Sequence, residues 1–227
     1  MKYSRFDSPL SSIFFAFSIF TFFIMSAGCA TSSYFKTPND VYRMNGIIFM
    51  EDGTRKNGRI TILYENNLDI KEGSVTFIPE GDSTTQSLSA DQIKYYTIND
   101  NVYVPKKIRL YMQNQYHLLF VKRLTTESDR MQLYNLHQEF KSNDTGEIED
   151  YYFVSFPGFS KYEVIDTNGL AMIPNLEINM AGYIGDCTQL LNKIASKQKG
   201  YYYNMMSLRG KREEVIKNIV REYNACE

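Results

Sequence analysis

The cysteines are the residues of this chain whose chemistry depends most on their surroundings. The 227 residues contain three of them, Cys29, Cys187 and Cys226. A thiolate can act as a nucleophile or bind a metal, a thiol can carry a lipid, and two thiols in an oxidising compartment can form a disulfide. Cys29 comes directly after the small residues Ser-Ala-Gly at 26–28, which end an apolar segment. This position indicates which of these uses applies.

Residues 1–28 are organised as a secretory signal. Lys2 and Arg5 are followed by an uncharged run at 10–25, which reads LSSIFFAFSIFTFFIM. A short positive segment before an apolar one is typical of a signal peptide. The run is shorter than the about 20 apolar residues that span a bilayer core, so a transmembrane helix is the weaker alternative.

The segment MSAGC at 25–29 resembles the bacterial lipobox, in which a large aliphatic residue and two small residues precede a cysteine. The resemblance implies cleavage before Cys29, a diacylglycerol on its thiol, and a further acyl chain such as palmitate on its new amino group. Two or three chains anchor stably, because each buried methylene contributes about 0.8 kcal/mol. Met25 in place of the commoner Leu is a departure from the pattern.

The residues after Cys29 indicate where the lipoprotein is sorted. Ala30, Thr31 and Ser32 include no acidic residue of the kind that retains enterobacterial lipoproteins at the inner membrane. No acidic cluster of the kind that directs some lipoproteins to the cell surface follows either. We therefore expect a lipid anchor in the outer membrane, on its periplasmic face, with 29–40 as the lipidated N-terminus and tether.

Composition limits the partners and the fold. The chain has 25 Lys and Arg against 26 Asp and Glu, so no strong positive field favours nucleic acid as a partner. Its 18 Tyr and 15 Phe, with short runs of Ile and Val, suit pleated sheets. A mature chain of about 200 residues is enough for one domain with a sizeable core.

The segment 41–166 predicts an antiparallel β domain, a sandwich or an open barrel, because short apolar or alternating runs follow one another without helices. We expect strands at 41–50, 58–64, 67–70, 74–79, 84–89, 92–98, 101–104, 107–113, 115–124, 130–140, 148–156 and 160–165. Turns are expected at Asp52-Gly53, Asn57-Gly58, Asn99-Asp100 and Asp144-Thr145-Gly146, since these residues tolerate positive φ or bond their own backbone.

A connector at 167–185 leads to a predicted two-helix hairpin at 186–227, which makes the fold class α+β and mainly β. In the first helix Asp186 is expected to act as the cap. The second begins near Lys211, and its apolar residues repeat at three and four. Antiparallel helices joined by 200–210 would place Cys187 beside Cys226, so we expect a disulfide, with two separate buried thiols as the alternative. Closing that loop would stabilise the fold by about 3–4 kcal/mol.

Several short segments resemble exported proteins of uncharacterised function from Bacteroidota. They are GRI at 58–60, YVPKKI at 103–108, FVKRL at 120–124 and the ending GDC…NKI…IVREYNAC. The resemblance implies a β-rich body with a helical, cysteine-bearing C-terminus. It brings no catalytic residues with it.

Other constellations favour structural interpretations. The tripeptide at 144–146 matches that of aspartic proteases, but its polar flanks favour a turn. His117 and His137 lie in predicted strands, and a zinc site needs three or four ligands. The acidic cluster at 147–150 lacks the spacing of an EF-hand. We therefore expect no catalytic residue, no metal and no cofactor.

The segment GYYYNMMSLRG at 200–210 is the strongest candidate for an interaction surface. Its residues that could bind a partner are Tyr201, Tyr202, Tyr203, Met205 and Met206. Some of them must pack on the sheet, or the segment is an exposed apolar tip. We expect a non-catalytic binding or scaffolding module for an envelope protein or polymer. A carbohydrate-binding accessory lipoprotein, with a row of exposed Tyr on one sheet face, is the alternative, and a hydrolase comes third.

The assignment of Cys29 predicts metabolic labelling. Cells given a clickable fatty acid should label the wild-type chain, because its thiol and new amino group carry acyl chains. A Cys29→Ala chain should carry no label, and a Cys187→Ala chain, which keeps the lipobox, should be labelled as the wild type is. Label retained by Cys29→Ala would contradict the lipoprotein assignment.

Overall fold

The computed structural model describes residues 41–62, 74–109, 116–139, 148–169, 172 and 176–226. The predicted signal peptide, Cys29, the tether, the strand at 67–70 and the turn at 144–146 lie outside the described residues. Among the residues that are described, no helix is both long and apolar enough to cross a membrane.

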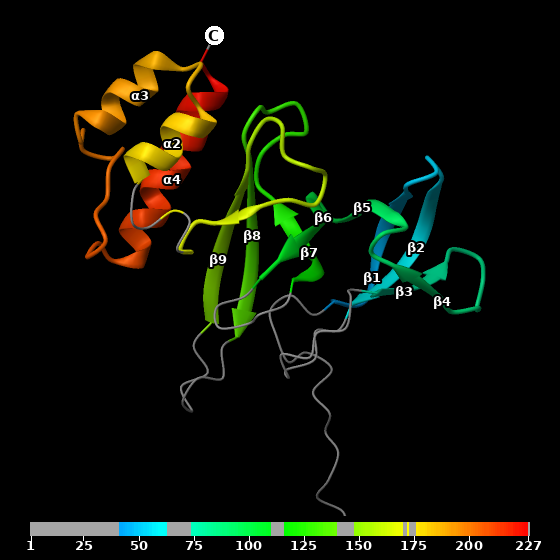
Figure 1. The fold of residues 1–227 in the computed structure, drawn as a ribbon. Helices are drawn as coiled ribbons and strands as arrows, with labels where there is room; N and C mark the ends of the chain where they lie inside the picture. The colour runs from blue at the N-terminus through cyan, green and yellow to red at the C-terminus, as the bar shows by residue number, and fades with distance from the viewer. Residues whose placement is uncertain are drawn as a thin grey trace, which may run out of the picture. The chain divides into compact units, whose positions relative to one another are not determined.

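In the described part of the chain, ten strands form one open antiparallel sheet (Figure 1). They are β1 (Val41–Met50), β2 (Arg55–Ile62), β3 (Ser74–Pro79), β4 (Gln86–Ser89), β5 (Ile93–Ile98), β6 (Asn101–Ile108), β7 (His117–Arg123), β8 (Gln132–Glu139), β9 (Ile148–Ser155) and β10 (Ile165–Asp166). Their order in the sheet is β10-β9-β8-β7-β6-β5-β1-β2-β3-β4. The predicted fold class, α+β and mainly β, is confirmed, and the described strands form a single open sheet where the sequence predicted a sandwich or an open barrel.

Strand β6 is one continuous element where the sequence predicts two strands broken near Pro105. Pro105 pairs with Phe120 of β7. The amide of Lys107, two residues on and therefore facing the same side, donates to the carbonyl of Tyr162 at 2.8 Å instead of to a neighbouring strand. The missing N–H of Pro105 therefore falls on a side where the ladder needs no donor. The loop that holds Tyr162 replaces most of the predicted strand at 160–165, of which only the short β10 forms.

The predicted turn at Asn57-Gly58 is wrong. These residues lie in the middle of β2, and Gly58 pairs with Gly46 of β1. A Cβ on Gly58 would lie 2.3 Å from the carbonyl oxygen of Ile78, and one on Gly46 would lie 2.5 Å from that of Thr97. Tertiary contacts therefore select glycine at both positions, and the hairpin turns at Gly53, whose φ is +87°.

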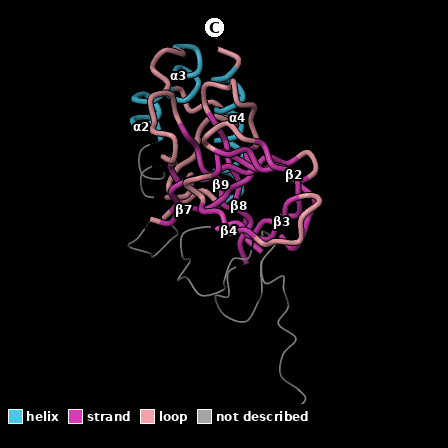
Figure 2. The backbone as a smooth tube through the Cα atoms, turned by 90° about the vertical axis from the view of Figure 1, so that its right-hand side faces the viewer, coloured by secondary structure: helices cyan, strands magenta, loops and turns pink. Residues whose placement is uncertain are grey.

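Three helices follow the sheet: α2 (Leu176–Tyr183), α3 (Thr188–Ala195) and α4 (Arg209–Asn224). They gather beside one another, as Figures 1 and 2 show. Helix α2 corrects the prediction of a plain connector at 167–185. Leu176, Met180 and Ile184 recur every four residues there and are buried in one cluster with Leu133 of β8 and Val154 of β9.

Helices α3 and α4 form the predicted antiparallel hairpin. Cys187 and Cys226 are paired as a disulfide with their Cα atoms 6.1 Å apart, as the sequence predicts. Farther along, Lys193 forms an ion pair with Glu222. At the far end, the amide of Asn218 donates to the carbonyl of Gly200 at 3.1 Å.

Asp186 does not cap α3, which corrects another prediction. The residue before this helix is Cys187, whose side chain makes no capping hydrogen bond. The carboxylate of Asp186 instead pairs with Arg130 and accepts from the Tyr223 hydroxyl at 3.0 Å. Tertiary partners therefore take the oxygen atoms that the local pattern assigned to a cap.

The glycine contacts predict opposite effects of one substitution at two sites. Gly58→Ala should lower the free energy of unfolding by about 1–3 kcal/mol, because the new methyl group overlaps a backbone carbonyl and the Phe77 ring. Gly210→Ala, in α4 with no atom within 4 Å of the new Cβ, should raise it by up to about 1 kcal/mol. Chemical denaturation measures both. Equal effects at the two sites would contradict the pairing of Gly58 with Gly46.

Candidate functional site

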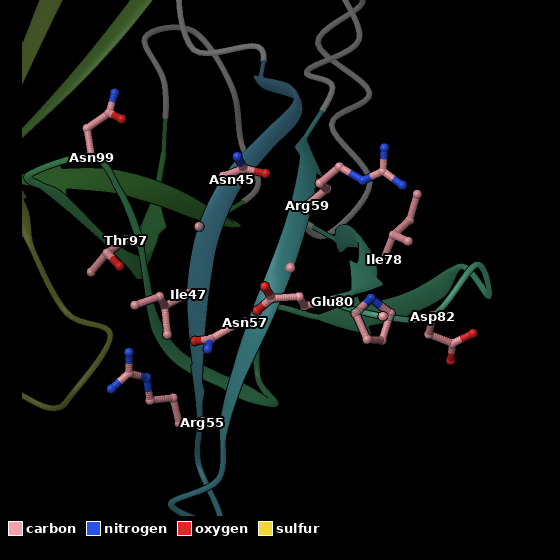
Figure 3. Close-up of a pocket in the computed structure, with 14 residues that line it drawn as sticks. Asn45, Ile47, Arg55, Asn57, Arg59, Ile78, Glu80, Asp82, Thr97 and Asn99 are labelled. Atoms are coloured by element: carbon pink, nitrogen blue, oxygen red, sulfur yellow. The ribbon is translucent and has the colours of Figure 1, made fainter.

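A groove of about 600 Å³ lies over β1, β2, β3 and β5 (Figure 3). It is lined by Asn45, Gly46, Ile47, Arg55, Asn57, Gly58, Arg59, Ile78, Pro79, Glu80, Gly81, Asp82, Thr97 and Asn99. Successive strand residues face opposite sides of a sheet. The side chains of Ile48 and Ile60 face the buried core, so the residues next to them in sequence, Ile47 and Arg59, face outward into the groove.

Strand register sets the groove side chains in rows. One row crosses three strands as Asn45, Arg59 and Ile78, and the next crosses β5, β1 and β2 as Thr97, Ile47 and Asn57. Opposite residues in such rows have their Cβ atoms about 5 Å apart. Each row therefore combines two polar side chains with one isoleucine.

The groove carries unused hydrogen-bonding capacity. The side chains of Asn45, Asn57 and Asn99 make no hydrogen bond to any other described residue, and the Arg59 guanidinium forms no ion pair with one. All four residues are exposed. Each amide offers both donors and an acceptor, and the guanidinium offers only donors.

Asp82 contributes an ionised acceptor at the edge of the groove. The side-chain hydroxyl and then the backbone amide of Thr84 donate to its carboxylate and lower the pKa of Asp82 below its usual range. The amide contact measures 2.9 Å. Such a carboxylate is charged at neutral pH and accepts hydrogen bonds, whereas a general acid needs a raised pKa.

Aromatic rings bound the groove beside Arg55. The rings of Phe49 and Tyr95 stack with centroids 4.3 Å apart. Arg55 lies 5.8 Å from the centroid of Phe49, and Lys94 lies 5.9 Å from that of Tyr95. A cation thus lies over each of the two rings. The described strands do not contain the aligned row of exposed Tyr that was expected of a sugar binder. The stacked pair of Phe49 and Tyr95 lies beside the groove instead.

The segment 200–210 divides into a packed part and an exposed part. Tyr203 is 1% exposed and its hydroxyl donates to the Met172 carbonyl at 3.3 Å, so its assignment to an interaction surface is wrong. Tyr201 and Tyr202 are half-buried against the helical cluster. Exposed apolar side chains follow them, and we call these the apolar tip: Met205 at 64%, Met206 at 90% and Leu208 at 82% exposed.

No metal site forms among the residues that the structure describes, since no group of three or more His, Cys, Asp or Glu side chains is close enough to hold an ion. His117 begins β7 opposite Ile108. His137 lies in β8 opposite Asp150. The two histidines therefore take part in different strand pairings.

Lys106 is a buried cation in β6. It is 7% exposed, its Nζ donates to the Lys161 carbonyl at 2.5 Å, and it lies 4.7 Å from the centroid of the Tyr134 ring. Burial, followed by the positive charges of Lys161 and Arg123, lowers the pKa of Lys106 to about 8. Burial also raises the pKa of Tyr134 to about 12.

Comparison with known proteins adds no relative to this description. No protein-family model, no curated protein and no solved structure matches the chain. Its described residues define an α+β protein, mainly β, with one open antiparallel sheet and a polar groove on that sheet.

The groove is the feature that sequence patterns missed. Its signal is present as two Asn-Gly dipeptides, at 45–46 and 57–58, within two neighbouring strands. The second dipeptide fits a hairpin turn by local rules. Only the strand register shows that the two dipeptides face each other.

Lys106 predicts a pH dependence of stability. The folded state loses the Lys106 proton near pH 8, whereas the unfolded chain keeps it to about pH 10. The unfolded state therefore binds more protons in this window, and stability rises with pH. Relative to a Lys106→Met variant, the wild type should gain about 2 kcal/mol in free energy of unfolding from pH 8 to 10.

A Lys107→Met variant is the matched control, because Lys107 is exposed on the same strand. Its difference from the wild type should not change over this pH range. Denaturant unfolding at three pH values measures both series. A constant difference between wild type and Lys106→Met would contradict the buried position of Lys106.

Proposed function

We propose that this protein is a lipoprotein anchored in the outer membrane by Cys29, where it acts as a non-catalytic binding or scaffolding module of the cell envelope. The lipobox pattern at 25–29 supports the anchor. The paired Cys187 and Cys226 are consistent with an exported chain, because disulfides persist in oxidising compartments. The partner would be an envelope protein or polymer.

The apolar tip is the observation that carries the binding role. Three large apolar side chains are exposed on one short segment, while the tyrosines just before them are packed into the helical cluster. Exposed apolar groups that adjoin one another mark interaction sites more often than isolated ones do. Helix α4 begins at Arg209, directly after Leu208, so the C-terminal end of the tip is fixed to a folded helix.

Contacts on both sides hold the backbone of the tip. Before Met205, the backbone N–H of Asn204 donates to the Ser207 hydroxyl at 3.1 Å. Beyond Leu208, the Arg212 guanidinium donates to the Ser207 carbonyl at 2.6 Å. A partner would therefore meet a partly ordered surface and lose less conformational freedom on binding.

A carbohydrate-binding accessory lipoprotein is the second candidate. The observation that favours it is the polar groove on the sheet, which combines amides, guanidinium groups and carboxylates around a small apolar floor.

The tip predicts a position-specific cross-link in intact cells. A photoreactive phenylalanine analogue at position 206 should give a discrete adduct in the envelope fraction, because Met206 is 90% exposed on the tip. The adduct should be lost when Met205 and Leu208 are both changed to Ser in the same chain. These two side chains are exposed, so the changes should leave the fold intact.

The same probe at position 178 is the matched control. Ile178 is 72% exposed on α2 and lies outside the tip. It should give no adduct of that mass. Equal adducts from positions 178 and 206, or none from position 206, would overturn the role of the tip.

A further inference from the structure

The two Asn-Gly dipeptides occupy positions where neither residue type favours a sheet. Asparagine and glycine are both depleted in strand interiors. The glycines are accounted for by close packing, since a Cβ on Gly58 would also lie 2.7 Å from the Phe77 ring. The asparagines are not accounted for in this way, because the side chains of Asn45 and Asn57 make no hydrogen bond to other described residues. Within the described residues, the sheet therefore gains no side-chain hydrogen bond from these two amides.

The lining of the groove balances donors, acceptors and charge. Arg55 and Arg59 supply two positive charges, and Glu80 and Asp82 supply two negative ones. A polyanion would meet the two carboxylates, and a polycation would meet the two guanidinium groups. A neutral chain rich in hydroxyl groups meets neither penalty, because each hydroxyl both donates and accepts.

The dimensions suit an extended ligand. The groove crosses four neighbouring strands, and three interstrand steps span about 14 Å. Its volume of about 600 Å³ lies within the range of small-molecule sites. Ile47, Ile78 and Pro79 give the floor apolar surface that can contact the C–H face of a sugar ring.

Figure 3 shows how the polar groups are distributed around this floor. Asn45 and Arg59 lie toward one end, Asn57 and Glu80 lie near each other at the centre, and Arg55 lies at the opposite end. Hydrogen-bonding groups thus occur along the whole groove. This distribution suits a chain of repeated polar units better than a single small anion.

We propose that this groove binds a short stretch of a neutral glycan, whose hydroxyl groups bond to the amides of Asn45, Asn57 and Asn99. The proposal rests on the envelope binding role proposed above, and it names the ligand class of a second surface, separate from the apolar tip. Binding is non-covalent, and the glycan leaves unchanged.

The test uses the full lipidated chain in lipid nanodiscs. Cellohexaose, maltohexaose, mannohexaose and chitohexaose are titrated by calorimetry, with hexagalacturonate as the acidic comparison. At least one neutral hexasaccharide should bind, and it should shift the side-chain amide signals of Asn45 and Asn57 in NMR spectra. Binding by none of them, tighter binding of hexagalacturonate, or shifts confined to other residues would each overturn the proposal.

Threonine substitutions separate binding from folding. Asn45→Thr and Asn57→Thr remove the amide but favour the strand, so neither should lower stability. Each should weaken glycan binding about tenfold. Lys107→Thr, a matched change on an exposed residue of β6 outside the groove, should leave the affinity unchanged. Unchanged affinity in Asn57→Thr would refute the site.

The outcomes for the groove and the tip are independent. If the glycan titrations fail while position 206 still cross-links, the groove proposal fails and the envelope binding role stands. If the glycan binds while position 206 gives no adduct, the tip fails and the groove stands. The Ser changes at Met205 and Leu208 should not alter glycan affinity, because neither residue lines the groove.

Discussion

The central sheet depends on one packing constraint: atoms of neighbouring strands lie so close to Gly46 and Gly58 that neither position has room for a Cβ. These two residues face each other across β1 and β2, and carbonyl oxygens of the flanking strands occupy the space where a Cβ would lie. On the inner side Ile60 and Phe77 are fully buried and fill the space over the glycines. On the outer side the neighbouring residues Asn45 and Asn57 are short, so the surface there is hollowed into the groove.

A second set of contacts ties the helices to the sheet. Arg130, just before β8, pairs with Asp186 and donates to the Cys226 carbonyl at 3.2 Å, and it lies 4.4 Å from the centroid of the Tyr223 ring. The Asn224 side chain accepts from the Met131 amide at 2.8 Å and donates to its carbonyl at 2.9 Å. These contacts surround the disulfide at the end of α4, whereas the apolar tip precedes the start of that helix.

The contrast between what sequence patterns predicted and what they missed has a physical basis. Strand β3 was predictable because alternation alone places Val75 and Phe77 on one buried face. The pairing of Cys187 with Cys226 was predictable because two amphipathic helices joined by a short connection lie antiparallel, which places the start of the first helix beside the end of the second. The turn assigned to Asn57-Gly58 failed because local turn preference cannot sense a carbonyl of β3 that lies 2.3 Å from the missing Cβ.

The groove and the role of Tyr203 were beyond prediction for a related reason. Asn45 and Asn57 are twelve positions apart, and only the register that pairs Gly46 with Gly58 brings them into one surface. Tyr203 is of the same residue type as Tyr201 and Tyr202, but it is buried in the helical cluster and its hydroxyl donates to the carbonyl of Met172. Residue type predicted an interaction surface in this region, and the fold separates the packed Tyr203 from the exposed apolar tip.

The central claim is that a neutral glycan binds in the groove over β1, β2, β3 and β5. A crystal structure of the full chain with a bound neutral hexasaccharide tests it most directly, because it shows where the sugar lies. The account predicts sugar hydroxyl groups within hydrogen-bond distance of the amides of Asn45 and Asn57, with a ring against Ile47. A sugar bound elsewhere on the protein, with the groove filled only by solvent, would contradict it.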